Sequence, residues 1–203
     1  MRPMKKNYKT IAFISISAAI AFMIIAFTNA VKSNCPVKGS NNNHKFQHLD
    51  SLKNRSVAGS KIKTINLSEF LKSGKDENRF SNNDYVQTEG YVYLIKLGGS
   101  ETCNCHSKDK EQQDIHIEIC DTITSETINK DCMIVEINRY TRASNSAMDY
   151  KAIKQMVGKR VLIQGWLFFD EEHKQNAVNT DPDGKDWRKT CWEIHPCLKM
   201  EEI

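Results

Sequence analysis

The sequence predicts a mainly β protein: a five-stranded barrel with a helix between strands three and four, preceded by a short helix and an N-terminal membrane segment. Two observations predict this arrangement. A long charge-free stretch follows a cluster of basic residues at the N-terminus. Beyond it, segments of alternating apolar and polar residues are separated by turns, and one stretch with apolar residues three and four apart interrupts them.

The N-terminal segment carries the membrane signal. Residues 1–10 hold four basic residues, a cationic start expected in the cytoplasm, and no charged residue occurs from Thr10 to Val31. At about 1.5 Å per residue, segment 11–31 is long enough to cross a bilayer core of roughly 30 Å. Thr28-Asn29-Ala30 suits a signal peptidase, so the segment is either a cleaved signal peptide or an uncleaved anchor that partners the membrane. Both alternatives predict export across the cytoplasmic membrane, to a periplasmic or membrane-anchored position.

The rest of the chain is electrically neutral. Four of the 29 Lys and Arg residues belong to the leader, which leaves 25 against 25 Asp and Glu residues. Proteins that bind nucleic acid by neutralising phosphates need a basic excess, so the composition argues against a nucleic-acid partner. Residues 32–60 are rich in Ser, Asn, Lys and His and are expected to form a flexible tether. Residues 61–203 are expected to form the folded domain.

Two helices are expected in this domain. The first covers residues 66–73, where Leu67, Phe70 and Leu71 share one face and Gly74 follows the end. The second covers residues 146–157, where apolar residues repeat at three and four positions before a stop at a glycine.

Five strands are expected from alternation and from long apolar runs. In the clearest one, Ile115, Ile117 and Ile119 point one way and polar residues the other, which predicts one buried and one polar face. Pro196 is expected to stop the last strand, because it has no backbone N–H. The strands are expected at residues 85–97, 114–121, 132–138, 160–169 and 188–194. This element order is that of the OB-fold, a partly open Greek-key barrel, and an α+β sandwich of the same elements is the alternative.

The C-terminal part of the chain resembles a set of uncharacterised bacterial exported proteins. The resemblance rests on Gly165-Trp166-Leu167-Phe168-Phe169-Asp170 and on the closing segment Trp192-Glu193-Ile194-His195-Pro196. A Cys-Asn-Cys loop and an Asp-x-His strand extend it over roughly residues 85 to 200. This family has no assigned activity, so the resemblance implies an OB-like barrel and supports the choice of site positions, and it implies no reaction.

The seven cysteines predict disulfides if the chain is exported. Cys35 lies in the expected tether and is the natural odd one out. Free or buried thiols are one alternative, and a zinc site that uses His106 with the neighbouring cysteines is another, although that spacing is shorter than in most zinc sites. The disulfide candidates are Cys103, Cys105, Cys120, Cys132, Cys191 and Cys197.

Candidate catalytic residues lie two apart on two expected strands. Asp114 and His116 project from one face of the second strand, and Glu193 and His195 from one face of the fifth. A carboxylate beside a histidine can orient the ring for proton transfer or metal ligation. The alternative is that both pairs belong to a solvated outer face or fix strand register.

The candidate ligand-binding residues combine these histidines with a long polar loop. Loops 98–113 and 170–186 are expected to flank the ligand face of an OB barrel, with strands two and five both beside strand one. The predicted ligand-binding residues are His173, Asn176, Asn179, His116 and His195. Trp166 and Trp192 are expected in the core.

Two functions remain open. One is an exported or membrane-anchored OB-like binding module for a small ligand, glycan or protein partner. The other is a metal-dependent hydrolase in which His116, His173 and His195 hold a divalent metal such as zinc, with Asp114 or Glu193 as a ligand or general base. Phosphate-cradling glycine loops and a Gly-x-Ser-x-Gly elbow do not occur in the sequence, which argues against nucleotide hydrolases and serine hydrolases.

Overall fold

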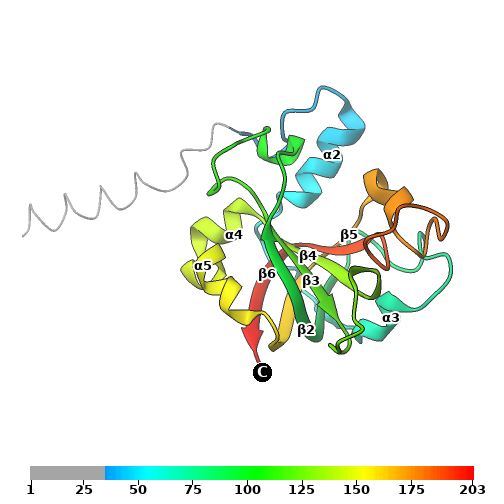
Figure 1. Ribbon diagram of the computed structural model, residues 1–203. Helices are drawn as coiled ribbons and strands as arrows, with labels where there is room; N and C mark the ends of the chain where they lie inside the picture. The colour runs from blue at the N-terminus through cyan, green and yellow to red at the C-terminus, as the bar shows by residue number, and fades with distance from the viewer. Residues whose placement is uncertain (1–34) are drawn as a thin grey trace, which may run out of the picture. The chain divides into compact units, whose positions relative to one another are not determined.

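The computed structural model describes residues 35–203 (Figure 1). The expected signal peptide or anchor at residues 11–31 lies outside the described residues. Within residues 35–203, no helix combines the length and the apolar composition needed to cross a membrane.

The described chain is mainly β, and five of its strands close into a barrel. The strand order is β1-β2-β3-β4-β6-β5, with β5 returning to pair with β2 and β1 as an outer strand. Within the barrel, β4 and β6 are parallel and the other neighbours are antiparallel. The strands are β1 (Lys63–Thr64), β2 (Tyr85–Leu97), β3 (Ile115–Cys120), β4 (Met133–Ile137), β5 (Arg160–Phe169) and β6 (Trp192–Glu202).

Short helices and 3-10 turns connect the strands. The single helix expected over residues 146–157 is divided at Asp149, whose extended backbone separates a 3-10 turn at Ser146–Met148 from an α-helix at Tyr150–Ile153. The α-helices are α2 (His44–Lys53), α3 (Leu67–Leu71), α4 (Arg139–Ser144) and α5 (Tyr150–Ile153). The 3-10 turns are η1 (Thr102–Asn104), η2 (Asn129–Asp131), η3 (Ser146–Met148), η4 (Lys154–Met156) and η5 (Glu171–Asn176).

The inner face of the barrel is the apolar core. Ile115, Ile117 and Ile119 are all fully buried there, as the alternation predicts, together with side chains from every other barrel strand. Trp192 is buried, as expected. Trp166 is only half-buried, and its indole N–H donates to the Val57 carbonyl at 2.8 Å, so its placement in the core was wrong.

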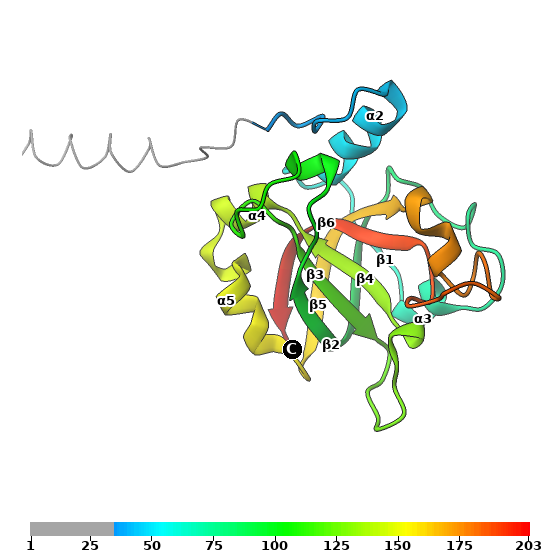
Figure 2. The same cartoon turned by 45° about the horizontal axis from the view of Figure 1, so that its top comes forward.

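The outer, polar face of β3, β4 and β6 is buried as well. His116 keeps 6% exposure, Glu118 none and Glu136 6%. Figure 2 shows α2 and the η5 segment lying beside this part of the barrel. The alternative of a solvated outer face is therefore wrong, because the segments before β1 and after β5 fold over it.

The segment expected as a flexible tether, residues 32–60, is part of the domain from Cys35 onward. Asn43 caps α2 by accepting from the Lys45 N–H, and Leu49, Asp50 and Lys53 are buried. The Asn54 amide donates to the Cys103 carbonyl at 2.9 Å. Hydrogen bonds made by polar side chains hold this segment in place, and it has no run of apolar residues. Its composition therefore resembles that of a linker.

Two disulfides link the described residues. Cys35–Cys105 joins the N-terminal segment to the loop after β2, and Cys120–Cys132 closes the β3–β4 connection. The expectation that Cys35 stays unpaired is wrong, and its bond to Cys105 removes that thiol from the zinc alternative. Cys103, Cys191 and Cys197 are buried free thiols, so the prediction of disulfides is wrong for these three cysteines.

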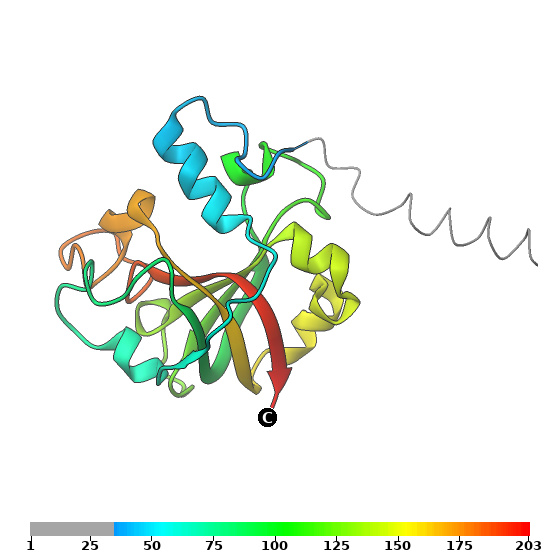
Figure 3. The ribbon, with the colours of Figure 1, turned by 180° about the vertical axis from the view of Figure 1, so that it is seen from behind.

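Strand β6 continues through Pro196 to Glu202, so the expected stop is wrong. The pairing with β5 shifts register here, since Gly165 pairs with Cys197 and Leu167 with Ile194. The irregularity absorbs the missing N–H. A Cβ on Gly165 would lie 2.4 Å from the Pro196 carbonyl, so the close approach of β5 and β6 seen in Figure 3 needs glycine.

Candidate functional site

The centre of the site is a row of three side chains on the outer face of neighbouring strands. His116 comes from β3, Glu136 from β4 and His195 from β6. His116 Nδ1 lies 2.9 Å from Glu136 Oε1, and His195 Nδ1 lies 3.5 Å from Glu136 Oε2. The expectation that β3 and β6 both flank β2 holds for β3 and is wrong for β6, which pairs with β4 and β5. Because β3 and β6 both flank β4, Glu136 stands between the two histidines.

His195 is fully buried among carboxylates. Its Nε2 lies 3.3 Å from Asp114 Oδ2, and its Nδ1 lies 3.5 Å from Glu193 Oε2. Neither ring nitrogen makes a hydrogen bond within the described chain. The ring also packs edge-on to Phe168, at 5.9 Å between centroids. Three acidic groups thus approach one imidazole without hydrogen-bond geometry.

A second group of charges surrounds Arg188, which is fully buried. Its guanidinium lies 3.0 Å from Asp170 Oδ2 and 2.7 Å from Glu193 Oε1. His173 Nδ1 contacts the same Asp170 oxygen at 2.6 Å. Because Glu193 also faces His195, it connects this group to the three-strand row.

Lys53 of α2 brings a further buried cation to the site. Its ammonium lies 2.9 Å from Glu101 Oε2 and over the Phe168 ring, at 5.4 Å from the centroid. Burial lowers the pKa of Lys53, but nearby acidic groups, Glu101 first, outweigh it and hold that pKa well above 10.5. Lys53 is therefore a permanent cation.

The acidic surroundings hold both buried histidines in the protonated form. Burial opposes the charge on His116, but its contacts with Glu118 and Glu136 outweigh burial and raise its pKa to about 9. Burial likewise opposes the charge on His195, and Asp114 and Glu193 raise its pKa to about 10. In the structure as it stands, these imidazoles balance the charge of the carboxylates.

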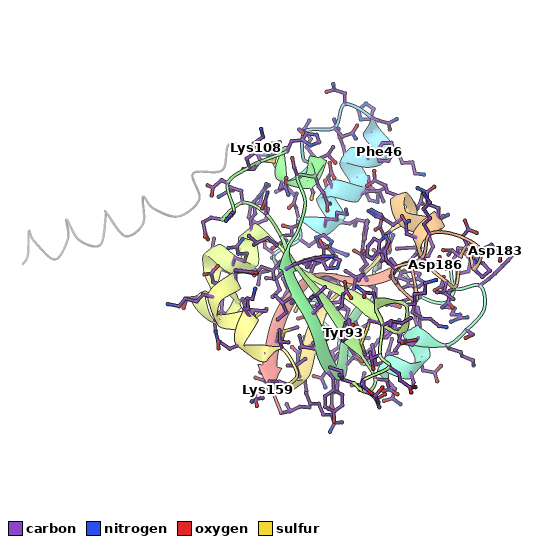
Figure 4. The ribbon with its side chains drawn as sticks, viewed as in Figure 1. Phe46, Tyr93, Lys108, Lys159, Asp183 and Asp186 are labelled. Atoms are coloured by element: carbon purple, nitrogen blue, oxygen red, sulfur yellow. A yellow bond between two sulfur atoms is a disulfide. The ribbon has the colours of Figure 1, made fainter. Side chains whose placement is uncertain are left out.

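A cavity of about 250 Å³ opens onto this face. Strands β2, β3, β4 and β6, the loop after β2 and the segment after β5 all contribute to its wall. Figure 4 marks the last of these by Asp183 and Asp186, across the barrel from Lys159. The lining side chains with polar or aromatic groups are Lys53, Lys96, Glu101, His116, Glu136, Asp170, His173, Trp187, Arg188 and Glu193.

The structure brings some of the predicted site residues together. His116, His173 and Glu193 line the cavity, and Asp114 and His195 lie against its Glu136 wall without lining it. The cavity lining does not include the two predicted asparagines. Asn176 donates to the Lys185 carbonyl at 3.2 Å, and Asn179 donates to Lys72 and Asp76, so both hold loops in place.

Several site residues escaped the sequence analysis. Glu136 had a usable signal, since it is the one charged residue in an apolar strand and falls on the same face as the neighbouring polar pairs. The sequence around Lys53 gives no such signal, because its composition resembles that of a linker. The other residues missed are Glu101, Asp170, Trp187, Arg188 and Lys96.

One group of side chains among residues 35–203 has the composition and spacing of a metal site. It consists of Asp114, Glu136 and His195, whose donor atoms lie within 4.8 Å of one another, and all three are buried. The combination of His116, His173 and His195 predicted as ligands does not form such a group. His116 is instead hydrogen-bonded to Glu136, and His173 to Asp170.

No protein-family model and no curated protein sequence matches this chain.

Proposed function

We propose that this chain is an exported or membrane-anchored binding module, with a barrel of the OB type that holds a small polar ligand in the cavity on its outer face. The strand order supports the OB assignment. Numbered along the barrel, the strands follow the order one, two, three, five, four, with helices between three and four. OB barrels bind ligands on strands two and three and on the loops after strands one and four, and those elements line this cavity.

The cavity itself is the observation that carries the proposal. At about 250 Å³ it is slightly smaller than the pockets of most drug-sized ligands, which suits a molecule the size of an amino acid or a monosaccharide. Lys96 and Glu101 keep 51% and 33% side-chain exposure and offer charges of both signs. Trp187 adds an aromatic surface for stacking. A zwitterionic or amino-sugar ligand fits this wall better than an extended glycan or a protein segment.

Thermal unfolding of the full-length chain with a panel of free amino acids and amino sugars tests the proposal. At least one compound is expected to raise the Tm of the unaltered protein. Trp187→Ala should remove that shift, and Trp166→Ala, the matched change of a half-buried tryptophan outside the cavity lining, should preserve it. No shift with any compound, or equal loss in both variants, would contradict the proposal.

Export is part of the proposal, and the disulfides support it. Disulfides persist in oxidising compartments outside the cytoplasm, and this domain contains two. The charge-free stretch behind four basic residues supports the same orientation. A reporter that is active only in the cytoplasm, fused after Ile203, should therefore be inactive, and full activity would contradict export.

A metal-dependent hydrolase is the second candidate, favoured by the group formed by Asp114, Glu136 and His195. Glu193 lies beside this group and lines the cavity, so it is placed to take up a proton. A bound metal would polarise a carbonyl or phosphoryl oxygen. Hydrolysis of p-nitrophenyl acetate or phosphate that depends on Zn²⁺ and is lost in Glu193→Gln would favour this function over simple binding.

A further inference from the structure

We propose that Asp114, Glu136 and His195 bind a divalent transition-metal ion, with Zn²⁺ as the first candidate, beside the cavity wall. The donor set is two carboxylates and one imidazole, which suits Zn²⁺ and Mn²⁺. The proposal goes beyond the binding of an organic ligand, and it can fail without affecting that function.

The distances suit a small ion. Four-coordinate zinc, with bonds of about 2.0 to 2.1 Å, keeps its donor atoms roughly 3.3 to 3.4 Å apart. His195 Nε2 and Asp114 Oδ2 already lie 3.3 Å apart. Because all three donors lie within 4.8 Å of one another, no pair of donors needs to close by more than about 1.4 Å.

The second observation is the unpartnered imidazole. His195 is fully buried, yet both of its nitrogens lack a hydrogen-bond partner within the described chain. Buried polar atoms without partners are rare in folded proteins and call for a water molecule, an ion or a ligand. Nε2 faces Asp114 and Nδ1 faces Glu136, and a metal ion bound to one of these nitrogens would give that nitrogen and both carboxylates a partner.

The third observation is the distribution of permanent cations. Asp114 and Glu136 are buried, and among residues 35–203 they form ion pairs with histidines alone. The other acidic groups of the cavity wall have a lysine or arginine partner: Glu101 pairs with Lys53, and Asp170 and Glu193 pair with Arg188. The two carboxylates without such a partner are the two in the metal group. A divalent cation would compensate their charge in place of the His195 proton, which would be released to solvent when the imidazole binds the ion.

Neighbouring groups are placed to position the ligands. His116 Nδ1 donates to Glu136 Oε1 at 2.9 Å, which leaves Oε2 directed at His195. The Cys103 thiol lies 3.7 Å from Asp114 Oδ2. Outer contacts of this kind orient the ligands in known metal sites. His116 is thus a positioning residue in this proposal and not a ligand.

Metal binding by the full-length chain, purified in detergent and stripped with EDTA, tests the proposal. Titration with ZnCl₂ against a chromophoric chelator should give one tight equivalent per chain. Asp114→Asn and His195→Gln should each weaken that equivalent by about 100-fold or more, beyond the 10- to 100-fold typical of outer contacts. No tight equivalent in the unaltered protein would overturn the proposal.

Two control variants separate this site from others. Glu118→Gln removes a buried carboxylate of the same outer face, and this variant should still bind one Zn²⁺ ion tightly per chain. His44 and His48, exposed and one turn apart on α2, form a possible adventitious zinc pair. Loss of zinc in the His44→Ala/His48→Ala variant, or retention in both ligand variants, would overturn the proposal.

A spectroscopic measurement keeps the proposal testable if a ligand variant does not fold. Co²⁺ bound to the unaltered protein should give the visible bands of a four- or five-coordinate ion, without the near-ultraviolet charge-transfer band of a thiolate. A thiolate band would assign the metal to Cys103 or another free cysteine and overturn the proposal.

Discussion

The inner and outer faces of β3, β4 and β6 are both buried, yet they have opposite chemistry. Along β3, Ile115, Ile117 and Ile119 point into the barrel, and His116 and Glu118 point out beneath the covering segments. Each apolar side chain contributes about 1.5 to 3 kcal/mol by leaving water. Buried charges gain little net stability, because desolvation cancels most of their attraction. A buried charged face is therefore a poor way to stabilise a barrel, and its presence favours a binding role.

The largest effect is expected on the inner face. Ile117→Asp places an unpaired carboxylate in the apolar core, which should cost several kcal/mol and abolish cooperative unfolding of a domain of ordinary stability. Ile117→Val, the matched conservative change, should cost only about 0.5 to 1.5 kcal/mol. Circular dichroism with urea titration measures both. A folded Ile117→Asp protein would mean that the two faces are not distinct.

A smaller loss is expected when the outer face loses its central cation. Arg188→Met leaves Asp170 and Glu193 buried without their shared guanidinium, which should cost about 3 to 5 kcal/mol in urea unfolding. Adding Asp170→Asn and Glu193→Gln removes the uncompensated charges. The triple variant should therefore recover most of the loss, and failure to recover would show that the arginine acts through packing.

The inner face was predictable because alternation in a strand depends on local sequence alone. The strand bounds Tyr85–Leu97 and Arg160–Phe169 agree with the predicted ranges for the same reason. The outer face was predictable only in part: the pairs at Asp114 and Glu193 follow from spacing, but their burial depends on segments distant in sequence. Nothing local to Lys53 shows that its helix covers the barrel.

The register irregularity around Pro196 was not predictable either, because it also depends on a segment distant in sequence. A proline predicts a missing hydrogen bond, but whether the strand stops depends on the neighbouring strand, where Gly165 permits a close approach. The pairing of the disulfides was not predictable either, because Cys35 and Cys105 are 70 residues apart in the sequence and come together only in the folded chain.

At the partly exposed contact between His173 and Asp170, we expect a moderate contribution to stability that depends on pH. The hydrogen bond to Asp170 raises the pKa of His173 above 6.5, although burial opposes this. Burial favours neutral Asp170, but His173, Arg188 and Lys53 outweigh it and hold its pKa below 3.8. The raised pKa of His173 contributes stability that is complete below about pH 6.5, the pKa in the unfolded chain. This stability is lost as pH rises through the pKa of His173 in the folded protein. The lowered pKa of Asp170 contributes stability that is present above about pH 3.8 and is lost in stronger acid.

His173→Gln is therefore expected to cost about 1 kcal/mol near pH 5, a modest value because the side chain is partly exposed. The difference between the variant and the unaltered protein should shrink as pH rises above 7. Urea unfolding at a series of pH values measures it. A difference that does not change with pH would show that His173 contributes by packing and not by its charge.

The smallest effect is expected where charges remain in water. Arg160 and Glu89 form an ion pair at 2.7 Å between β5 and β2, with side chains 52% and 43% exposed. Solvent screens such pairs, so Glu89→Gln should change the free energy of unfolding by less than about 0.5 kcal/mol, and added salt should make that change smaller still. This variant is the exposed counterpart of the changes on the outer face. A loss comparable to that of Arg188→Met would mean that burial does not set the cost of breaking an ion pair in this barrel, and the contrast between its exposed and buried charges would then fail.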